Sequence, residues 1–186
     1  NDAPSTMTRM INMGVESFLV GSAVNLVTAQ RLARRNCAEC SEPIEIPAAA
    51  LIDAGFLSED VGTLSPMHGK GCGVCNGTGY KGRVGIYQVM PVFDEIRDAV
   101  YAGKNSDEIN EIAISKGVKT LRMAALNKVK EGAISLEACM RVTVADEWQC
   151  RNGKQKTDKG SRRTVSAMRH IKRPQPQAEA GRAGWR

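Results

Sequence analysis

Apolar residues between positions 93 and 143 recur three or four places apart, which is the spacing of helices with one buried face. Each of the first three apolar stretches ends at a glycine, a residue that readily adopts the left-handed conformation of a helix C-terminus. Ser106 and Thr120 precede two of them as expected caps. The expected helices span residues 93–102, 106–116 and 120–131, and a last helical turn begins at Ser135. This pattern predicts a compact helical bundle whose apolar stripes form a core.

The earlier part of the chain mixes helical and strand patterns. The expected elements are helices at residues 7–13 and 48–56 and a strand at 83–92. Residues 24–35 are ambiguous between helix and strand, and their near-alternation favours a strand. The first helix is expected to end at Gly14, with Pro4-Ser5-Thr6 forming the cap region before it. Pro43 and Pro47 interrupt the chain, and residues 58–71 are expected to form a loop. The pattern therefore predicts an α/β protein.

Beyond residue 143 the periodic apolar pattern stops. Gln, Lys, Arg, Ser and Gly dominate there, and this composition predicts a disordered tail over residues 144–186. The tail carries 11 Lys and Arg against 4 Asp and Glu, whereas residues 1–143 carry 15 basic and 16 acidic side chains. The formal net charge of +6 therefore comes from the tail, so a nucleic-acid interpretation of that charge can concern only the tail.

Length and composition exclude several classes of protein. The 186 residues are 42% apolar, which is enough for one globular domain or two small ones and excludes wholesale disorder. No apolar run approaches the roughly 18–20 residues of a membrane span. The N-terminus carries neither a secretion signal nor an initiator Met, so the chain is expected to be a piece of a larger protein.

Four of the six cysteines form two C-x-x-C pairs, Cys37 with Cys40 and Cys72 with Cys75, separated by 31 residues. Two such turns can bring four thiolates together around one Zn²⁺. Glycines surround the second pair, as expected where the backbone turns tightly toward a metal. Two disulfides, buried free thiols and a redox pair are the alternatives. The missing secretion signal argues against disulfides, and neither pair opens a helix after a strand, as a redox pair would.

Three other residues, His68, Cys139 and Cys150, carry side chains that could bind a metal or react. His68 could replace a thiolate, but four cysteines complete the shell, and His68 is expected to be an exposed loop residue. Cys139 shares a helical face with Leu136 and Met140, so it is expected to be a small core residue. Cys150 is expected to be a stray thiol in the tail.

The second cysteine pair opens a long run that is the most specific motif in the chain. It reads Cys75-Asn76-Gly77-Thr78-Gly79-Tyr80-Lys81-Gly82-Arg83-Val84-Gly85-Ile86-Tyr87. Other informative runs occupy residues 1–6, 10–16, 29–32, 34–35 and 120–122. Together, and in this order, they resemble the C-terminal part of the PilB/GspE family, the ATPases of type IV pilus assembly and type II secretion. The resemblance covers residues 1 to about 143.

This resemblance implies a fold and a setting. It implies the C-terminal end of a RecA-like ATPase domain at residues 1–36, a zinc lobe at 37–82, a strand and helical bundle at 83–143, and the basic tail at 144–186. It also implies a homohexamer that contacts an inner-membrane platform protein from the cytoplasmic side. The zinc would be structural and held by Cys37, Cys40, Cys72 and Cys75, whereas ATP and Mg²⁺ belong to the full-length protein. No nucleic-acid partner is expected.

The catalytic motifs of the family do not occur in this sequence. No Gly-Lys is followed by Ser or Thr, as the phosphate-binding loop requires, and neither the acidic boxes nor the histidine box is present. The segment alone is therefore expected not to hydrolyse ATP, and no catalytic residue is predicted. A stand-alone zinc module for protein interaction and a nucleic-acid-binding zinc ribbon are the other hypotheses. The tail departs from the family and is interpreted either as non-coding sequence or as a basic interaction tail.

Overall fold

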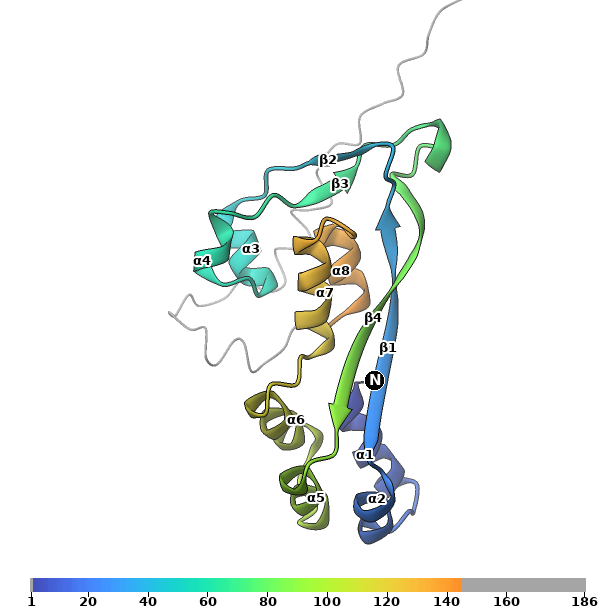
Figure 1. Cartoon of the computed structure of the whole chain (residues 1–186), viewed down its shortest axis with the longest axis vertical. Helices are drawn as coiled ribbons and strands as arrows, with labels where there is room; N and C mark the ends of the chain where they lie inside the picture. The colour runs from blue at the N-terminus through green and yellow to red at the C-terminus, as the bar shows by residue number, and fades with distance from the viewer. Residues whose placement is uncertain (1, 145–186) are drawn as a thin grey trace, which may run out of the picture. The chain divides into compact units, whose positions relative to one another are not determined.

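The computed structural model describes residues 2–144, which form a mixed α/β unit (Figure 1). The remainder of the predicted tail, including Cys150, lies outside the described residues. The elements in chain order are α1 (Ala3–Asn12), α2 (Ser17–Ala23), β1 (Leu26–Asn36), β2 (Ser41–Pro43), α3 (Ala48–Ala54), α4 (Ser58–Val61), β3 (Met67–Gly69), the 3-10 turn η1 (Gly73–Cys75), β4 (Tyr80–Pro91), α5 (Asp94–Tyr101), α6 (Ser106–Ser115), α7 (Leu121–Lys130) and α8 (Leu136–Val142).

Strands β1 and β4 form a long antiparallel ribbon, with Leu26 opposite Pro91 and Arg34 opposite Arg83 (Figure 1). Both strands were predicted, and this prediction is confirmed; β4 begins at Tyr80, three residues before the predicted start. The buried side chains of the ribbon alternate with exposed ones, because neighbouring residues of a strand point to opposite faces. One face is thus buried under helices, and the other carries exposed Leu, Tyr and Val side chains.

A hydrophobic core joins one end of the ribbon to α1, α2, α5 and α6. Its largest fully buried members include Met7 of α1, Met90 of β4 and Ile109 of α6. Helix α1 begins at Ala3 rather than at residue 7, because Asp2 accepts a hydrogen bond from the Ser5 backbone N–H at 2.9 Å and caps the helix. The predicted helix at residues 7–13 was therefore too short, and its expected cap residues lie inside the helix.

The predicted C-terminal helices are confirmed as α5 to α8. Thr120 caps α7 as predicted, and Ser135, the predicted start of the last helical turn, caps α8. Each accepts a hydrogen bond from a backbone N–H three residues later at 3.1 Å. The predicted cap Ser106 was wrong by one residue. Asn105 caps α6, and the Glu108 side chain in turn accepts a hydrogen bond from the Asn105 backbone N–H at 3.1 Å.

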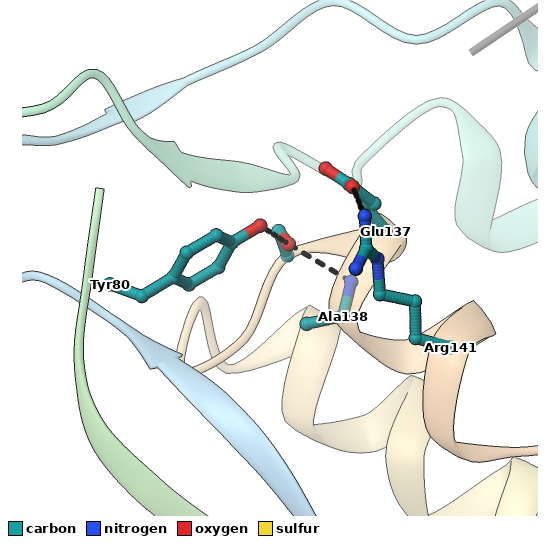
Figure 2. Close-up of polar contacts among 5 residues, drawn as sticks. Tyr80, Glu137, Ala138 and Arg141 are labelled. Atoms are coloured by element: carbon teal, nitrogen blue, oxygen red, sulfur yellow. Dashed lines mark hydrogen bonds and ion pairs between the residues drawn. The ribbon is translucent and has the colours of Figure 1, made fainter. Parts of the chain in front are cut away.

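Helices α7 and α8 pack against the ribbon near its cysteine end. Figure 2 shows the Tyr80 side chain, at the start of β4, reaching toward the first turn of α8. The Tyr80 hydroxyl lies 2.9 Å from the Ser135 hydroxyl, so the residue that caps α8 also ties that helix to the ribbon. An ion pair between Arg141 and Glu137, one turn apart on the exposed side of α8, completes the contacts drawn there.

Residues 37–79, between the two long strands, contain β2, β3, α3, α4 and η1, and we refer to this segment as the lobe. The predicted loop at residues 58–71 was wrong, since it contains α4 and β3, and Pro43 lies in β2 opposite Met67 rather than breaking the chain. Helix α3 confirms the predicted helix at 48–56, although it ends at Ala54. Helix α2 was not predicted. Within residues 2–144, no helix is long or apolar enough to span a bilayer.

Candidate metal centre

The two C-x-x-C turns bring four sulfur atoms to one point at the cysteine end of the ribbon. The Sγ atoms of Cys37, Cys40, Cys72 and Cys75 all lie within 4.8 Å of one another. Three of the separations are 3.9 Å for Cys37–Cys72, 3.8 Å for Cys40–Cys75 and 3.7 Å for Cys72–Cys75. The first pair follows the end of β1. In the second pair, Cys72 directly precedes η1 and Cys75 is the last residue of η1, shortly before β4 begins.

The glycines near the second pair allow the two cysteine loops to approach each other. A Cβ atom built on Gly69 would overlap the Gly79 backbone carbonyl, and one on Gly79 would overlap Gly69 in return. Gly79 also has φ +75°, a conformation that side chains other than glycine rarely adopt. The Cys37 N–H donates to the Gly79 carbonyl at 2.9 Å, so this glycine crossing holds the first pair beside the second.

Backbone N–H groups around the cluster point at the sulfur atoms. Cys75 Sγ accepts hydrogen bonds from the N–H groups of Cys72 at 3.1 Å and Gly79 at 3.2 Å, and Cys40 Sγ accepts one from Gly71 at 3.3 Å. The Cys72 N–H is the main cause that lowers the pKa of Cys75 to about 6, because the bond favours the thiolate. Burial raises the pKa of the Cys40 thiol to about 12.

The four residues fit a tetrahedral metal ion that prefers sulfur. A Zn–S bond of about 2.3 Å places the sulfur atoms of a regular tetrahedron about 3.8 Å apart, which is close to the three separations given above. The same distances exceed the roughly 2.05 Å of a disulfide, and all five cysteines among residues 2–144 are free thiols. Backbone N–H groups that donate to a sulfur atom favour the thiolate, which is the form of cysteine that binds a metal cation. A metal site is therefore the arrangement that this geometry supports.

The structure places the other candidate residues away from this cluster. His68 is not among the four clustered residues, and the expectation that it is an exposed loop residue was wrong. It lies half-buried in β3 opposite Glu42, and its Nδ1 atom is buried without a hydrogen-bond partner. Cys139 is fully buried on α8, which confirms that it belongs to the core, where burial raises the pKa of its thiol.

Two residues that were assigned no structural role from the sequence, Asn36 and Tyr80, connect the cysteine cluster to the rest of the unit. Asn36, immediately before Cys37, is buried, and its amide donates to the Met67 carbonyl at 3.1 Å and to the Gly132 carbonyl at 3.0 Å. It thereby links β1, β3 and the turn after α7. Tyr80 makes the equivalent link to α8 from the second pair. Their positions directly beside the cysteine loops were the signals available in the sequence.

Comparison with known proteins finds similar sequences over most of the chain. The family model described as "Type II/IV secretion system protein" matches residues 1–141. The type IV pilus assembly ATPase PilB of Myxococcus xanthus is 44% identical over 149 residues, which are 80% of this chain and 26% of the relative. The PilB of Acinetobacter baylyi is 44% identical over 145 residues, or 77% of this chain and 25% of the relative.

A relative named for secretion matches the same part of the chain. The type II secretion system protein E of Aeromonas hydrophila is 35% identical over 147 residues, which are 78% of this chain and 28% of the relative. The chain thus spans about a quarter of the length of these curated relatives. Because the family model covers well over half of its residues, the chain belongs to the Type II/IV secretion system protein family.

Proposed function

We propose that the chain acts as the C-terminal part of a motor ATPase that drives either type IV pilus assembly or type II protein secretion. The observation that carries this proposal is the family match over residues 1–141, together with relatives whose names divide between those two machines. The chain corresponds to a quarter of such a protein, so hydrolysis itself belongs to the remaining part. ATP and Mg²⁺ would be bound there, since this sequence has no phosphate-binding loop.

This segment would contribute subunit packing and contacts with other proteins rather than catalysis. Residues 1–36 would complete a RecA-like domain, residues 37–82 would form a zinc lobe, and residues 83–143 would form the terminal strand and bundle. In a homohexameric ring at the cytoplasmic face of the inner membrane, such a segment would contact neighbouring subunits and a membrane-embedded platform protein. The ribbon supports this role, because it joins the cysteine cluster to the α1, α2, α5 and α6 core in one hydrogen-bonded unit.

The metal in this proposal is one Zn²⁺ held by Cys37, Cys40, Cys72 and Cys75. Zinc with four thiolates has no open position for water, so it supplies cross-linking rather than catalysis. The protein contributes the N–H groups of Gly71, Cys72 and Gly79, which hold the thiolates in place. Asn36 and Tyr80 then transmit the position of the cross-linked loops to β3 and α8.

A graft experiment tests the proposed function. Residues 1–141 would replace the matching segment of PilB in Myxococcus xanthus and of protein E in Aeromonas hydrophila. We expect one graft to restore its machine, seen as surface pili or as secreted protein, and the identity of that graft assigns the machine. A matched graft with Cys75→Ser should fail. If both grafts are stable and hydrolyse ATP in vitro yet restore neither machine, or if neither stable graft hydrolyses ATP, the proposal is overturned.

A further inference from the structure

Charge is segregated between the ribbon and the lobe of this chain. Strands β1 and β4 contain no Asp or Glu, and their five basic residues are Arg31, Arg34, Arg35, Lys81 and Arg83. The lobe at residues 37–79 contains one basic residue, Lys70, and six acidic ones, Glu39, Glu42, Glu45, Asp53, Glu59 and Asp60. The ribbon therefore has a net charge of +5 and the lobe a net charge of −5, although residues 1–143 as a whole are nearly neutral.

Two basic residues of the ribbon occupy positions that destabilise the pairing of its strands. Arg34 lies directly opposite Arg83 in the strand register, and both side chains are exposed. Like charges at directly opposed positions destabilise an antiparallel pair. Within residues 2–144, Arg34, Arg35, Lys81 and Arg83 form no ion pair; Arg34 lies over the Tyr80 ring, 5.9 Å from its centroid. Apart from the contact between Arg34 and Tyr80, no interaction within residues 2–144 holds these four cationic groups, so they are available to anions.

The acidic residues of the lobe are mostly available in the same way. Glu42 pairs with Lys70 at 3.7 Å, and Asp60 pairs with Lys130 at 2.7 Å. The other four, which are exposed and form no ion pair within the described part of the chain, are Glu39, Glu45, Asp53 and Glu59. Among residues 2–144, four carboxylates and four cations are thus left without an ion-pair partner, although they lie on adjoining parts of one chain.

Exposed apolar side chains accompany both sets of charges. Leu32 and Tyr87 lie on the same ribbon face as Arg34 and Arg83, and they are 49% and 51% exposed. In the lobe, Ile52 next to Asp53 and Leu57 close to Glu59 are 46% and 61% exposed. We call the first set the ribbon surface (Leu32, Arg34, Arg83, Tyr87) and the second the lobe surface (Ile52, Asp53, Leu57, Glu59). Each offers apolar contact area beside charge of one sign, which is the composition of a specific interface.

We propose that the lobe surface of one copy of this chain binds the ribbon surface of the next copy, in a head-to-tail contact. The surfaces are complementary in charge and both carry apolar residues, and a contact between two different surfaces of the same molecule repeats from copy to copy and can close into a ring. The inference deepens the proposed function and rests on it for the expectation that subunits assemble in a ring. Arg34 and Arg83 would take the Asp53 and Glu59 carboxylates, whose planar shape suits guanidinium groups.

Charge exchange tests this contact on the zinc-loaded 186-residue chain by sedimentation velocity. The ribbon variant is Arg34→Glu with Arg83→Glu, and the lobe variant is Asp53→Lys with Glu59→Lys. We expect the parent chain to associate with rising concentration at about 50 mM salt, where the Debye length exceeds 10 Å, and each variant to associate at least about tenfold more weakly. An equimolar mixture of the two variants should regain association, because each supplies the surface that the other has reversed.

Several outcomes would overturn the contact. These are a parent chain that stays monomeric, variants that associate like the parent, and a mixture that fails to regain association although both variants are folded and hold zinc. Parent binding to phosphatidylglycerol vesicles or single-stranded DNA, lost in the ribbon variant while the chain stays monomeric, would assign the cations to another partner. The control, Arg9→Glu with Lys104→Glu, changes the net charge by the same amount as the ribbon variant. Both residues are exposed cations outside the ribbon, so this control should leave association unchanged. Sedimentation requires neither ATP nor pili, so its result is separate from that of the grafts.

Discussion

Removing the metal should open the lobe while the core at the other end of the ribbon stays folded. The perturbation is Cys75→Ser, which takes away the thiolate with two backbone N–H donors, or a chelator added to the parent chain. The large core cluster contains no residue between positions 37 and 79. The lobe therefore has little of the apolar packing that stabilises α1, α5 and α6.

The expected size of the effect follows from what is buried in the lobe. Apart from cysteines, its buried apolar side chains are Leu51, Ala54, Phe56 and Pro66. Burying a Leu or Phe side chain contributes about 1.5–3 kcal/mol, whereas a structural zinc contributes on the order of ten kcal/mol in small zinc peptides. The metal is thus the larger contribution by roughly a factor of two, and the lobe is expected not to remain folded without it.

Hydrogen exchange measured by mass spectrometry separates the two regions. Peptides from residues 41–79 should lose most of their protection on zinc removal, while peptides from α5 to α7 should retain it. Cys139→Ala is the matched control, because it removes a fully buried thiol outside the cluster and should leave zinc content unchanged. Unchanged protection of the lobe without zinc would refute the argument that the metal stabilises the lobe. Loss of protection throughout the chain would refute the argument that the core stays folded when the lobe opens.

Three further predictions concern the remaining parts of the chain. The isolated chain should show no micromolar ATP binding by calorimetry, because it lacks the phosphate-binding loop. Gly69→Ala should abolish zinc retention measured by elemental analysis, since its methyl would overlap the Gly79 carbonyl, whereas Gly73→Ala has open space and should be neutral. The Lys116 ammonium lowers the pKa of Glu95 below 4.5, so this pair stabilises the fold above that pH and the contribution is lost as pH falls through the lowered value. Thermal unfolding of Glu95→Gln should therefore depend less on pH below 4.5 than unfolding of the parent.

The helices after residue 93 could be predicted from the sequence because their signals are local. Thr120 and Ser135 precede apolar stripes at helical spacing, and glycines follow three of the stripes, so each boundary is encoded within a few residues. The error at α6 has the same local origin. Asn105 and Ser106 are both good capping residues, and only the reciprocal hydrogen bond with Glu108 distinguishes them.

The elements that escaped prediction depend on partners distant in the sequence. Strands β2 and β3 have three residues each and exist by pairing with one another across the lobe. Helix α2 has no capping side chain and packs against α5, about eighty residues later, where Gly21 meets the Tyr101 ring. The four cysteines could be predicted to converge because zinc chemistry restricts their spacing. The roles of Asn36 and Tyr80 could not, since their partners are Met67, Gly132 and Ser135.

The net charge of residues 1–143 is close to zero, but a net charge does not show how the individual charges are distributed along the chain. The ribbon, with a net charge of +5, and the lobe, with a net charge of −5, cancel in the total. Opposite charges interact over about a Debye length, which shortens from roughly 30 Å at 0.01 M salt to 8 Å at 0.15 M. When the net charge of a protein is small, that net charge makes its association depend little on salt concentration. Strong salt dependence in the described unit would therefore have to come from the segregation of its charges, and reversing Arg34 and Arg83 should remove it.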